Sequence, residues 1–443
     1  MTDTSANSQG TPSMAPDAPA AGDLKTADGK PLKAALAAAE ARARRRAFLL
    51  VLPLLAFVVM TFVAPIGQML LRSIHDPRFV VHRDVESGTK TPIMVELRGW
   101  FDKNPQGTEP DEAAYAALVS DLIQLSELKA QGNVGTRINY ELAGTKSLIS
   151  STTRKAPKME PPFKEAVLDA DQDWADPLLW QVMRGASSAY TGNFYLAALD
   201  RTRDADGNIV QVDEDRRLYV GNYGKTLALS AFITLACLIL GYPVAHLLAT
   251  LPLRHSNLLM IFVLLPFWTS LLVRTTSWIV LLQSQGVVND TLVAASIVAD
   301  DSRIQMIYNQ TGTIVAMVHI LLPFMVLPLY SVMRPINPTY VRAARSLGAT
   351  SWTAFRRIYV PQTVPGMGAG GLLVFILAVG YYITPALVGG ASGQLFSNFI
   401  AFHMQKSLNW SLAAALAALL LAGILLLYWL YDRLIGIDNL KLG

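Results

Sequence analysis

Six apolar stretches, each about long enough to cross a lipid bilayer, constrain the fold of this chain more than any other feature. A helix rises about 1.5 Å per residue, so roughly 20 residues cover a hydrocarbon core of about 30 Å. Helices satisfy their own backbone hydrogen bonds in that environment. The sequence therefore predicts an all-α polytopic membrane protein with six transmembrane helices. The predicted spans are residues 47–71, 226–251, 258–282, 313–332, 367–388 and 411–431.

Charge is segregated along the chain. Only 16% of the residues are charged and 52% are hydrophobic, whereas soluble domains are nearer a quarter charged. Most of the charge lies in the first 46 residues and in residues 72–222. The net charge of +4 is too small to suggest a nucleic-acid partner, and the basic residues stand beside apolar runs. Membrane lipid is thus the expected surrounding.

The spacing of cysteines, histidines and other reactive residues indicates neither a catalytic site nor a metal site. The single cysteine, Cys237, lies in an apolar run and cannot form an intrachain disulfide. The histidines are scattered, and no Cys/His spacing predicts a metal site. No Ser/His/Asp or Cys/His arrangement is indicated either, so we expect no catalytic residue and no bound metal.

The segregation divides the chain into four parts. Residues 1–32 are small and polar and are expected to be a disordered cytoplasmic tail. Residues 33–71 are predicted to form a basic helix and the first span. Residues 72–222 form a hydrophilic insertion between the first and second spans, and residues 223–443 form a core with the other five spans.

Orientation follows from the basic residues, because arginine and lysine favour cytoplasmic loops. The cluster 42–46, Arg254, the loop 334–366 and Arg433 all fall on one side of the predicted topology. Both termini are therefore predicted to be cytoplasmic, with the insertion outside.

The insertion is predicted to mix helices and strands. Apolar residues at helical spacing predict a helix over residues 111–130 and a second one near residues 163–185. Asp206-Gly207 is typical of a hairpin turn, here between residues 195–199 and 209–212, with 218–220 following as a further extended segment.

The loop 334–366 carries five arginines and no acidic residue. Pro338 can open a first short helix, and Gly348 can end it in a left-handed conformation. Ser351 can cap a second helix, which Pro361 is expected to close. The apolar residues at helical spacing in this second helix are Trp352, Phe355 and Ile358. This pattern predicts a two-helix elbow that transmits force from a soluble partner; the alternative is an amphipathic helix on the membrane surface.

The loop resembles the EAA loop of ABC importer permeases, the family with the MetI-like fold. The family pattern has Glu-Ala-Ala, then a glycine, and further on an isoleucine, a proline and a Pro-Gly pair. The residues that match it in order are Ala343, Ala344, Gly348, Ala349, Ile358, Pro361, Pro365 and Gly366. Arg342 stands where the family has glutamate, so the charge contact made there with the ATPase is expected to differ, or to be inverted.

The resemblance extends over about residues 222–443. Residues 264–274 are similar to the third-span region of the spermidine/putrescine-type branch, and residues 380–390 look like the end of that branch's fifth span. Arg274 lies deep in an apolar stretch, where arginine is costly: it can line a path, or its side chain can reach the outer surface. The candidate residues of the translocation path are Trp268, Arg274, Tyr381, Tyr382 and Thr384.

The resemblance implies a division of labour in a bacterial inner membrane. This permease would pair with a second permease, two ATPase subunits would bind ATP and Mg and dock at loop 334–366, and a binding protein would deliver the solute from outside. The segment Gly224-Lys225-Thr226 lacks the first glycine of a phosphate-binding loop, so no nucleotide or other cofactor is expected on this chain. The residues expected to couple to the ATPase are Arg342, Ala343, Ala344, Gly348, Ala349, Phe355 and Pro361.

The resemblance implies that the solute is a small organic molecule; a polyamine is one candidate, and other small organic solutes fit equally well. The rings of Tyr381 and Tyr382 can bind an ammonium by cation–π attraction, or they can pack against neighbouring helices. Two other classes of protein are alternatives. An ion-driven secondary transporter would normally need acidic residues in its spans, and none is evident. A sensor that detects a ligand with residues 72–222 would need a cytoplasmic output domain.

Overall fold

The computed structural model describes residues 32–84 and 86–435, so the predicted tail of residues 1–32 lies almost wholly outside the described residues. The chain divides into two units, residues 1–68 and 69–443. The described part of the first unit is helical: α1 (Leu32–Val58) continues through a π-helical turn (Val59–Val63) into α2 (Ala64–Arg72). Pro65 lacks an N–H group and its ring crowds the preceding turn, which a wider π turn accommodates.

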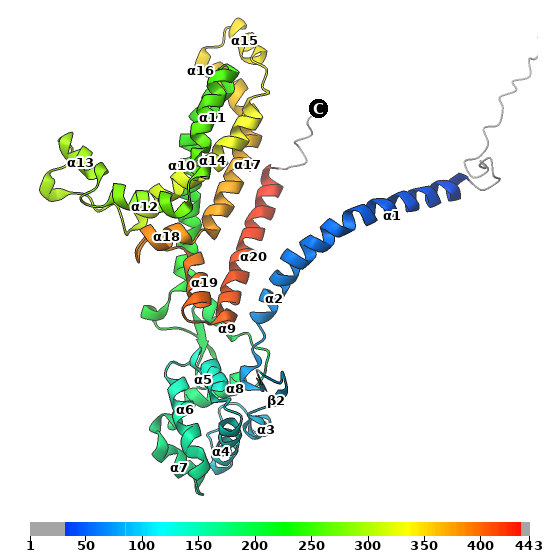
Figure 1. The fold of residues 1–443 in the computed structure, drawn as a ribbon, viewed down its shortest axis with the longest axis vertical. Helices are drawn as coiled ribbons and strands as arrows, with labels where there is room; N and C mark the ends of the chain where they lie inside the picture. Colours follow the sequence, from blue (N-terminus) through cyan, green and yellow to red (C-terminus); the bar gives the residue numbers. More distant parts are fainter. Residues whose placement is uncertain (1–31, 85, 436–443) are drawn as a thin grey trace, which may run out of the picture. The chain divides into compact units, whose positions relative to one another are not determined.

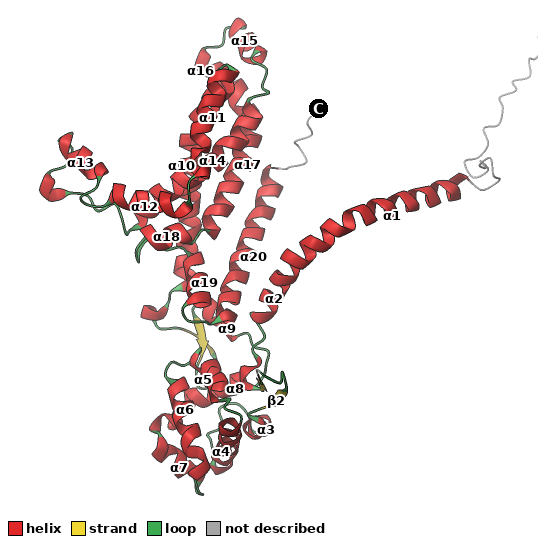
Figure 2. Ribbon diagram, viewed as in Figure 1, coloured by secondary structure: helices red, strands yellow, loops and turns green. Residues whose placement is uncertain are grey.

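The insertion is mainly helical (Figure 2). Its two sheets are antiparallel pairs of three-residue strands, so the strand content is smaller than the predicted mixture of helices and strands suggests. The strands are β1 (Val81–Arg83), β2 (Lys90–Pro92), β3 (Arg201–Arg203) and β4 (Ile209–Gln211). The helices are α3 (Val95–Lys103), α4 (Glu112–Glu127), α5 (Gln131–Asn139), α6 (Thr145–Lys155), α7 (Phe163–Ala170), α8 (Pro177–Ala186) and α9 (Asn193–Ala198).

The two helices predicted for the insertion meet different outcomes. Helix α4 agrees with the prediction over 111–130, and Asp111 caps it by accepting from the Ala114 N–H at 2.9 Å. The predicted helix over 163–185 is divided into α7 and α8, because Asp176 caps a new helix that starts at Pro177.

The hairpin turn is at Asp206-Gly207 as predicted, but the partner of Ile209–Gln211 is Arg201–Arg203 and not residues 195–199. The latter fall largely in α9, whose Phe194 is buried in an apolar cluster with Leu416 of the core. Residues 218–220 are not extended, because the Asp200 carboxylate accepts from the Leu218, Tyr219 and Val220 amides and so caps the next helix.

The core consists of long helices joined by short ones (Figure 1). In chain order they are α10 (Tyr219–Thr250), α11 (Leu253–Trp268), α12 (Leu271–Leu282), α13 (Val287–Ala294), α14 (Gln310–Met333), α15 (Thr339–Ser346), α16 (Ser351–Ala354), a π turn (Phe355–Tyr359), α17 (Val360–Gly380), α18 (Ile383–Val388), α19 (Phe396–Gln405) and α20 (Trp410–Ile435).

Helices α10, α14 and α17 form the centre of this core. Ile233 and Cys237, Met325 and Leu329, and Val374 are buried in one cluster. A Cβ added at Gly370 would lie 2.9 Å from the Met325 Sδ, so glycine permits the close approach of α14 and α17.

Among the described residues, five helices are long and apolar enough to cross a membrane, and six if one bent pair counts as a span. The bent pair is the third predicted span. It is not straight: α11 ends at Trp268, and the chain turns by 96° into α12 and α13. Pro266 cannot donate to the helix, and the Thr269 and Ser270 backbones are extended, which ends α11 here.

Candidate functional site

The first of the two helices predicted for the elbow between α14 and α17 is present as α15. Helix α15 ends in a Schellman motif: the Ala349 N–H donates to Ala344 O at 3.1 Å, and the Gly348 N–H donates to Arg345 O at 3.0 Å. Gly348 takes a φ of 92°, in the left-handed region that favours glycine. Ala344, Gly348 and Ala349 thus build one tight turn.

The second elbow helix differs from the prediction in two details. Thr350 and not Ser351 is its cap, accepting from the Thr353 N–H at 3.2 Å. Pro361 does not close the helix; the chain continues through a π turn into α17, so that Ser351–Gly380 is helical throughout. Pro361 is tolerated because it lies at the start of α17, where the π turn absorbs the missing N–H.

The elbow presents apolar and basic side chains outward. Leu347 is 90% exposed and Trp352 is 68% exposed. Arg342 and Ala343 of α15 are also exposed. In Figure 1, α15 and α16 lie at one end of the long helices α10, α14 and α17. The arrangement is a protruding knob with a basic, apolar surface.

An aromatic stack fixes the knob to the core. The Phe355 ring stacks on Trp352 and Tyr359, with centroid distances of 5.8 Å and 5.7 Å. Its edge contacts are with His246 and Tyr242 of α10, at 5.6 Å and 6.3 Å. These ring contacts pack the second elbow helix directly against α10.

Arg334 supplies a second connection that the sequence analysis did not find. Its Nη1 donates to Ala249 O at 2.7 Å and to Leu251 O at 3.1 Å, at the C-terminal end of α10. A cation is favoured there by the helix dipole. Its partners are backbone atoms distant in sequence, so no motif could have indicated them.

The candidate path residues are not all brought together. Arg274 lines a cavity of about 280 Å³ with Trp278 and His319, whose Nδ1 accepts from the Trp278 indole at 3.1 Å. The Arg274 Nε is buried and has no hydrogen-bond partner among the described residues. Trp278 was missed, although its spacing of four from Arg274 places both on one helix face.

The other four path candidates, Trp268, Tyr381, Tyr382 and Thr384, lie outside this cavity's lining. Trp268 is largely exposed at the end of α11, and Thr384 is buried in α18. Tyr381 and Tyr382 occupy the break between α17 and α18, where their carbonyls accept from Ser397 Oγ and Asn398 Nδ2. The fifth predicted span is therefore interrupted at these two tyrosines by a non-helical turn, which the two side-chain hydrogen bonds stabilise.

The sequence of the core is similar to that of known proteins. Residues 238–435 match the family described as binding-protein-dependent transport system inner membrane component. The spermidine/putrescine transport system permease protein PotB of Escherichia coli K12 is 37% identical over 214 residues, which cover 48% of this chain and 77% of that protein. PotB of Haemophilus influenzae is 34% identical over 224 residues, covering 51% of this chain and 78% of that protein.

One solved structure, a bacterial ABC transporter that imports alginate, is 19% identical with a TM-score of 0.42, covering 49% of this chain and 79% of the matched one. The identity and coverage of the PotB relatives define the class: this chain belongs to the family of binding-protein-dependent transport system inner membrane components. It is a multi-pass permease subunit of an ABC importer and is not itself an enzyme. The secondary-transporter and sensor alternatives are thereby set aside.

Proposed function

We propose that this permease imports a polyamine or a closely related organic amine across the bacterial inner membrane. The similarity to two PotB proteins, both named for spermidine and putrescine transport, carries the proposal. The matched region contains the core and not the insertion, since the family model begins at residue 238. The solute specificity is accordingly assigned to the core.

The knob formed by α15 and α16 is the docking site for an ATPase subunit that binds ATP and Mg. Its exposed Leu347 and Trp352 supply apolar contacts, and the Schellman turn at Gly348 keeps it rigid. Arg342 and Arg345 make it basic, so the facing surface of the ATPase is acidic. Two such subunits serve this permease and a second one, which completes the path.

The membrane topology follows from this docking. The elbow is cytoplasmic, and six spans of the MetI-like type place both termini in the cytoplasm when α11 to α13 count as one bent span. The insertion then lies outside, on the side where a binding protein delivers the solute. The basic residues at Arg254, Arg334 and Arg433 support this orientation.

A polyamine needs anionic or carbonyl partners in the path. The described residues of the long core helices include one acid, Asp432, near the end of α20. We propose that the second permease supplies the other acidic residues that a polyamine needs. One of these acids pairs with Arg274. An acid from that subunit would satisfy the free Arg274 Nε and leave further oxygens for the ammonium groups.

The experiment is reconstitution of this permease with its second permease, ATPase and binding protein in proteoliposomes. Spermidine or putrescine should stimulate ATP hydrolysis and accumulate in the vesicles, whereas sulfate and a neutral sugar should not. The matched control replaces the ATPase with a variant that binds ATP but does not hydrolyse it, which should abolish accumulation. Stimulation by sulfate and not by either amine would contradict the proposed solute.

A further inference from the structure

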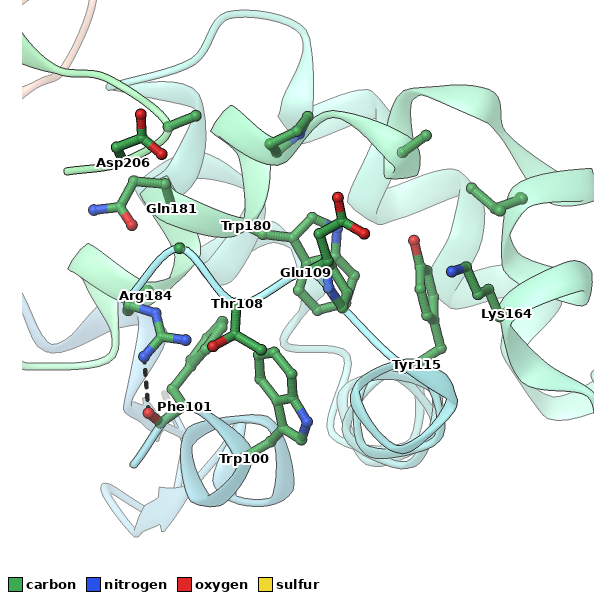
Figure 3. Close-up of a pocket in the computed structure, with 16 residues that line it drawn as sticks. Trp100, Phe101, Thr108, Glu109, Tyr115, Lys164, Trp180, Gln181, Arg184 and Asp206 are labelled. Atoms are coloured by element: carbon green, nitrogen blue, oxygen red, sulfur yellow. Dashed lines mark hydrogen bonds between the residues drawn. The ribbon is translucent and has the colours of Figure 1, made fainter. Parts of the chain in front are cut away.

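The insertion holds a cavity of about 460 Å³ with an aromatic wall (Figure 3). Helices α3, α4 and α8 contribute the rings of Trp100, Phe101, Tyr115 and Trp180. Trp180 meets Tyr115 and Trp100 edge to face, at centroid distances of 5.0 Å and 6.3 Å. Such interlocked rings hold the wall rigid.

The polar groups of these rings are already used inside the domain. The Trp100 indole donates to the Asp111 carboxylate at 3.0 Å, and both the Trp180 indole and the Tyr115 hydroxyl donate to Trp174 O. The rings therefore offer apolar surface to the cavity. A ligand's polar groups must find other partners.

Arg184 supplies such a partner. Its Nη1 donates to Phe101 O and Asn104 O, both at 2.8 Å, and its guanidinium carbon lies 4.8 Å from the Phe101 ring centroid. Its Nε and Nη2 make no hydrogen bond within residues 32–84 and 86–435. A guanidinium that is fixed at one nitrogen and free along the opposite edge is suited to bind a carboxylate with two hydrogen bonds.

Gln181 is the second observation. Its side chain is 8% exposed and lines the same cavity, yet its amide has no hydrogen-bond partner in the described part of the chain. Its amide atoms are not sealed from solvent, so they reach the surface of the cavity with their hydrogen-bonding capacity unused among the described residues. A ligand with a hydrogen-bonding group beside Arg184 would satisfy it.

The charges around the cavity balance. Glu109 and Asp206 oppose Lys164 and Arg184, and no pair among these four side chains forms a salt bridge. A polyamine would meet two cations here, and a simple anion would meet two carboxylates. A zwitterion, by contrast, can pair with both signs at once.

We propose that this cavity binds a free amino acid with a large apolar side chain. The carboxylate is held by Arg184 and Gln181, the ammonium faces Glu109 and Asp206, and the side chain lies against the aromatic wall. The site is separate from the translocation path, and the inference does not depend on which solute the permease imports.

The test is calorimetric titration of the full-length protein in lipid nanodiscs, with L-phenylalanine, L-leucine and L-methionine as probes. Phenethylamine lacks the carboxylate and 3-phenylpropionate lacks the ammonium, so they are matched controls for L-phenylalanine. We expect at least one amino acid to bind at millimolar concentrations or below, and the two controls to bind about tenfold more weakly or not at all. Failure of all three amino acids, or equal binding of phenethylamine, would overturn the proposal.

Variants locate the binding site. Gln181→Leu removes an amide that has no partner, so the fold should be retained while amino-acid affinity falls about tenfold. Arg184→Lys keeps the charge but loses the planar fork and should also weaken binding. Arg154→Gln, on the exposed surface of α6, is the control and should bind normally. Unchanged affinity in a folded Gln181→Leu protein, together with unchanged affinity in Arg184→Lys, would remove this cavity as the site.

Discussion

The Arg334 guanidinium donates to the carbonyl of Ala249 at 2.7 Å, which joins the first residue after α14 to the end of α10. The same nitrogen also reaches Leu251 O. Hydrogen bonds from a charged donor contribute roughly 1.5–3 kcal/mol each when they are shielded from water. This contact therefore holds the base of the elbow against the C-terminal end of α10.

Replacing Arg334 with glutamine should loosen the base of the elbow. We expect the purified permease to lose about 1–3 kcal/mol of stability, and ATP hydrolysis to continue with less solute moved per ATP. Thermal unfolding and the transport-to-hydrolysis ratio in proteoliposomes measure the two effects. Arg154→Gln is the matched control, because Arg154 is exposed on α6 and lies outside the elbow. Equal behaviour of the two variants would contradict the anchoring role of Arg334.

Gly348 offers a second test, because the structure restricts the residue at this position only through its backbone φ of 92°. A Cβ added there would meet nothing within 4 Å, so any effect of substitution arises from backbone conformation and not from a clash. Gly348→Val should strain the turn by about 1–2 kcal/mol and uncouple hydrolysis from uptake. Gly348→Asn, which tolerates the left-handed conformation, should retain most of the coupling.

Uptake and co-purification of the ATPase subunits are the readouts for both Gly348 variants. Wild-type uptake by Gly348→Val would show that the left-handed turn is dispensable. Equal loss in the valine and asparagine variants would point to a requirement for a bare backbone at the ATPase surface.

Local signals were sufficient to predict the first elbow helix and α4. In both, a capping or breaking residue stands at the boundary: Gly348 ends α15, and Asp111 begins α4. Where a tertiary contact decides the conformation, the sequence predicts poorly. Asp200 caps α10 across 18 residues of chain, and this distant carboxylate lets the helix begin at Tyr219, so that residues 219 and 220 are helical.

The same distinction applies to the candidate site. Composition identifies 258–282 as apolar but contains no information on its direction, so the 96° turn after Trp268 could not be predicted. The placement of Arg274 beside His319 depends on that turn. The cavity in the insertion is lined by four separate segments of chain. No local sequence pattern predicts that these segments come together.

Substitution of Arg342 tests the charge inversion proposed for the ATPase docking surface. Its side chain is exposed on a helix without acidic residues. If it faces an acid of the ATPase, Arg342→Glu should reduce co-purification of the ATPase about tenfold or more, since like charges across an interface are strongly unfavourable. A matched reversal on the ATPase should restore assembly. Arg345→Glu, one turn further on, shows whether the effect is specific; no loss with Arg342→Glu would place Arg342 in solvent.

Asp121 makes the stability of the insertion dependent on pH. Its carboxylate caps α3 from another helix, accepting from the Leu97 N–H at 2.8 Å and the Glu96 N–H at 3.2 Å. Burial raises the pKa of Asp121 from 3.8 to about 6, against the lowering effect of these hydrogen bonds. Between these two values the folded state holds more protons than the unfolded state.

The sign of the effect follows from that difference in protonation. The stabilisation is complete below about pH 4 and is lost as the pH rises through about 6, by at most about 3 kcal/mol. Asp76 contributes little in this window, because Arg78 and Arg137 outweigh its burial and lower its pKa.

Hydrogen exchange of the α3 amides in the full-length protein, corrected for the intrinsic effect of pH, should therefore show protection that falls from pH 4 to pH 7. Asp121→Asn removes the titration and one capping bond, so its protection should start lower and remain flat. A parallel slope in both proteins would assign the pH dependence to another group.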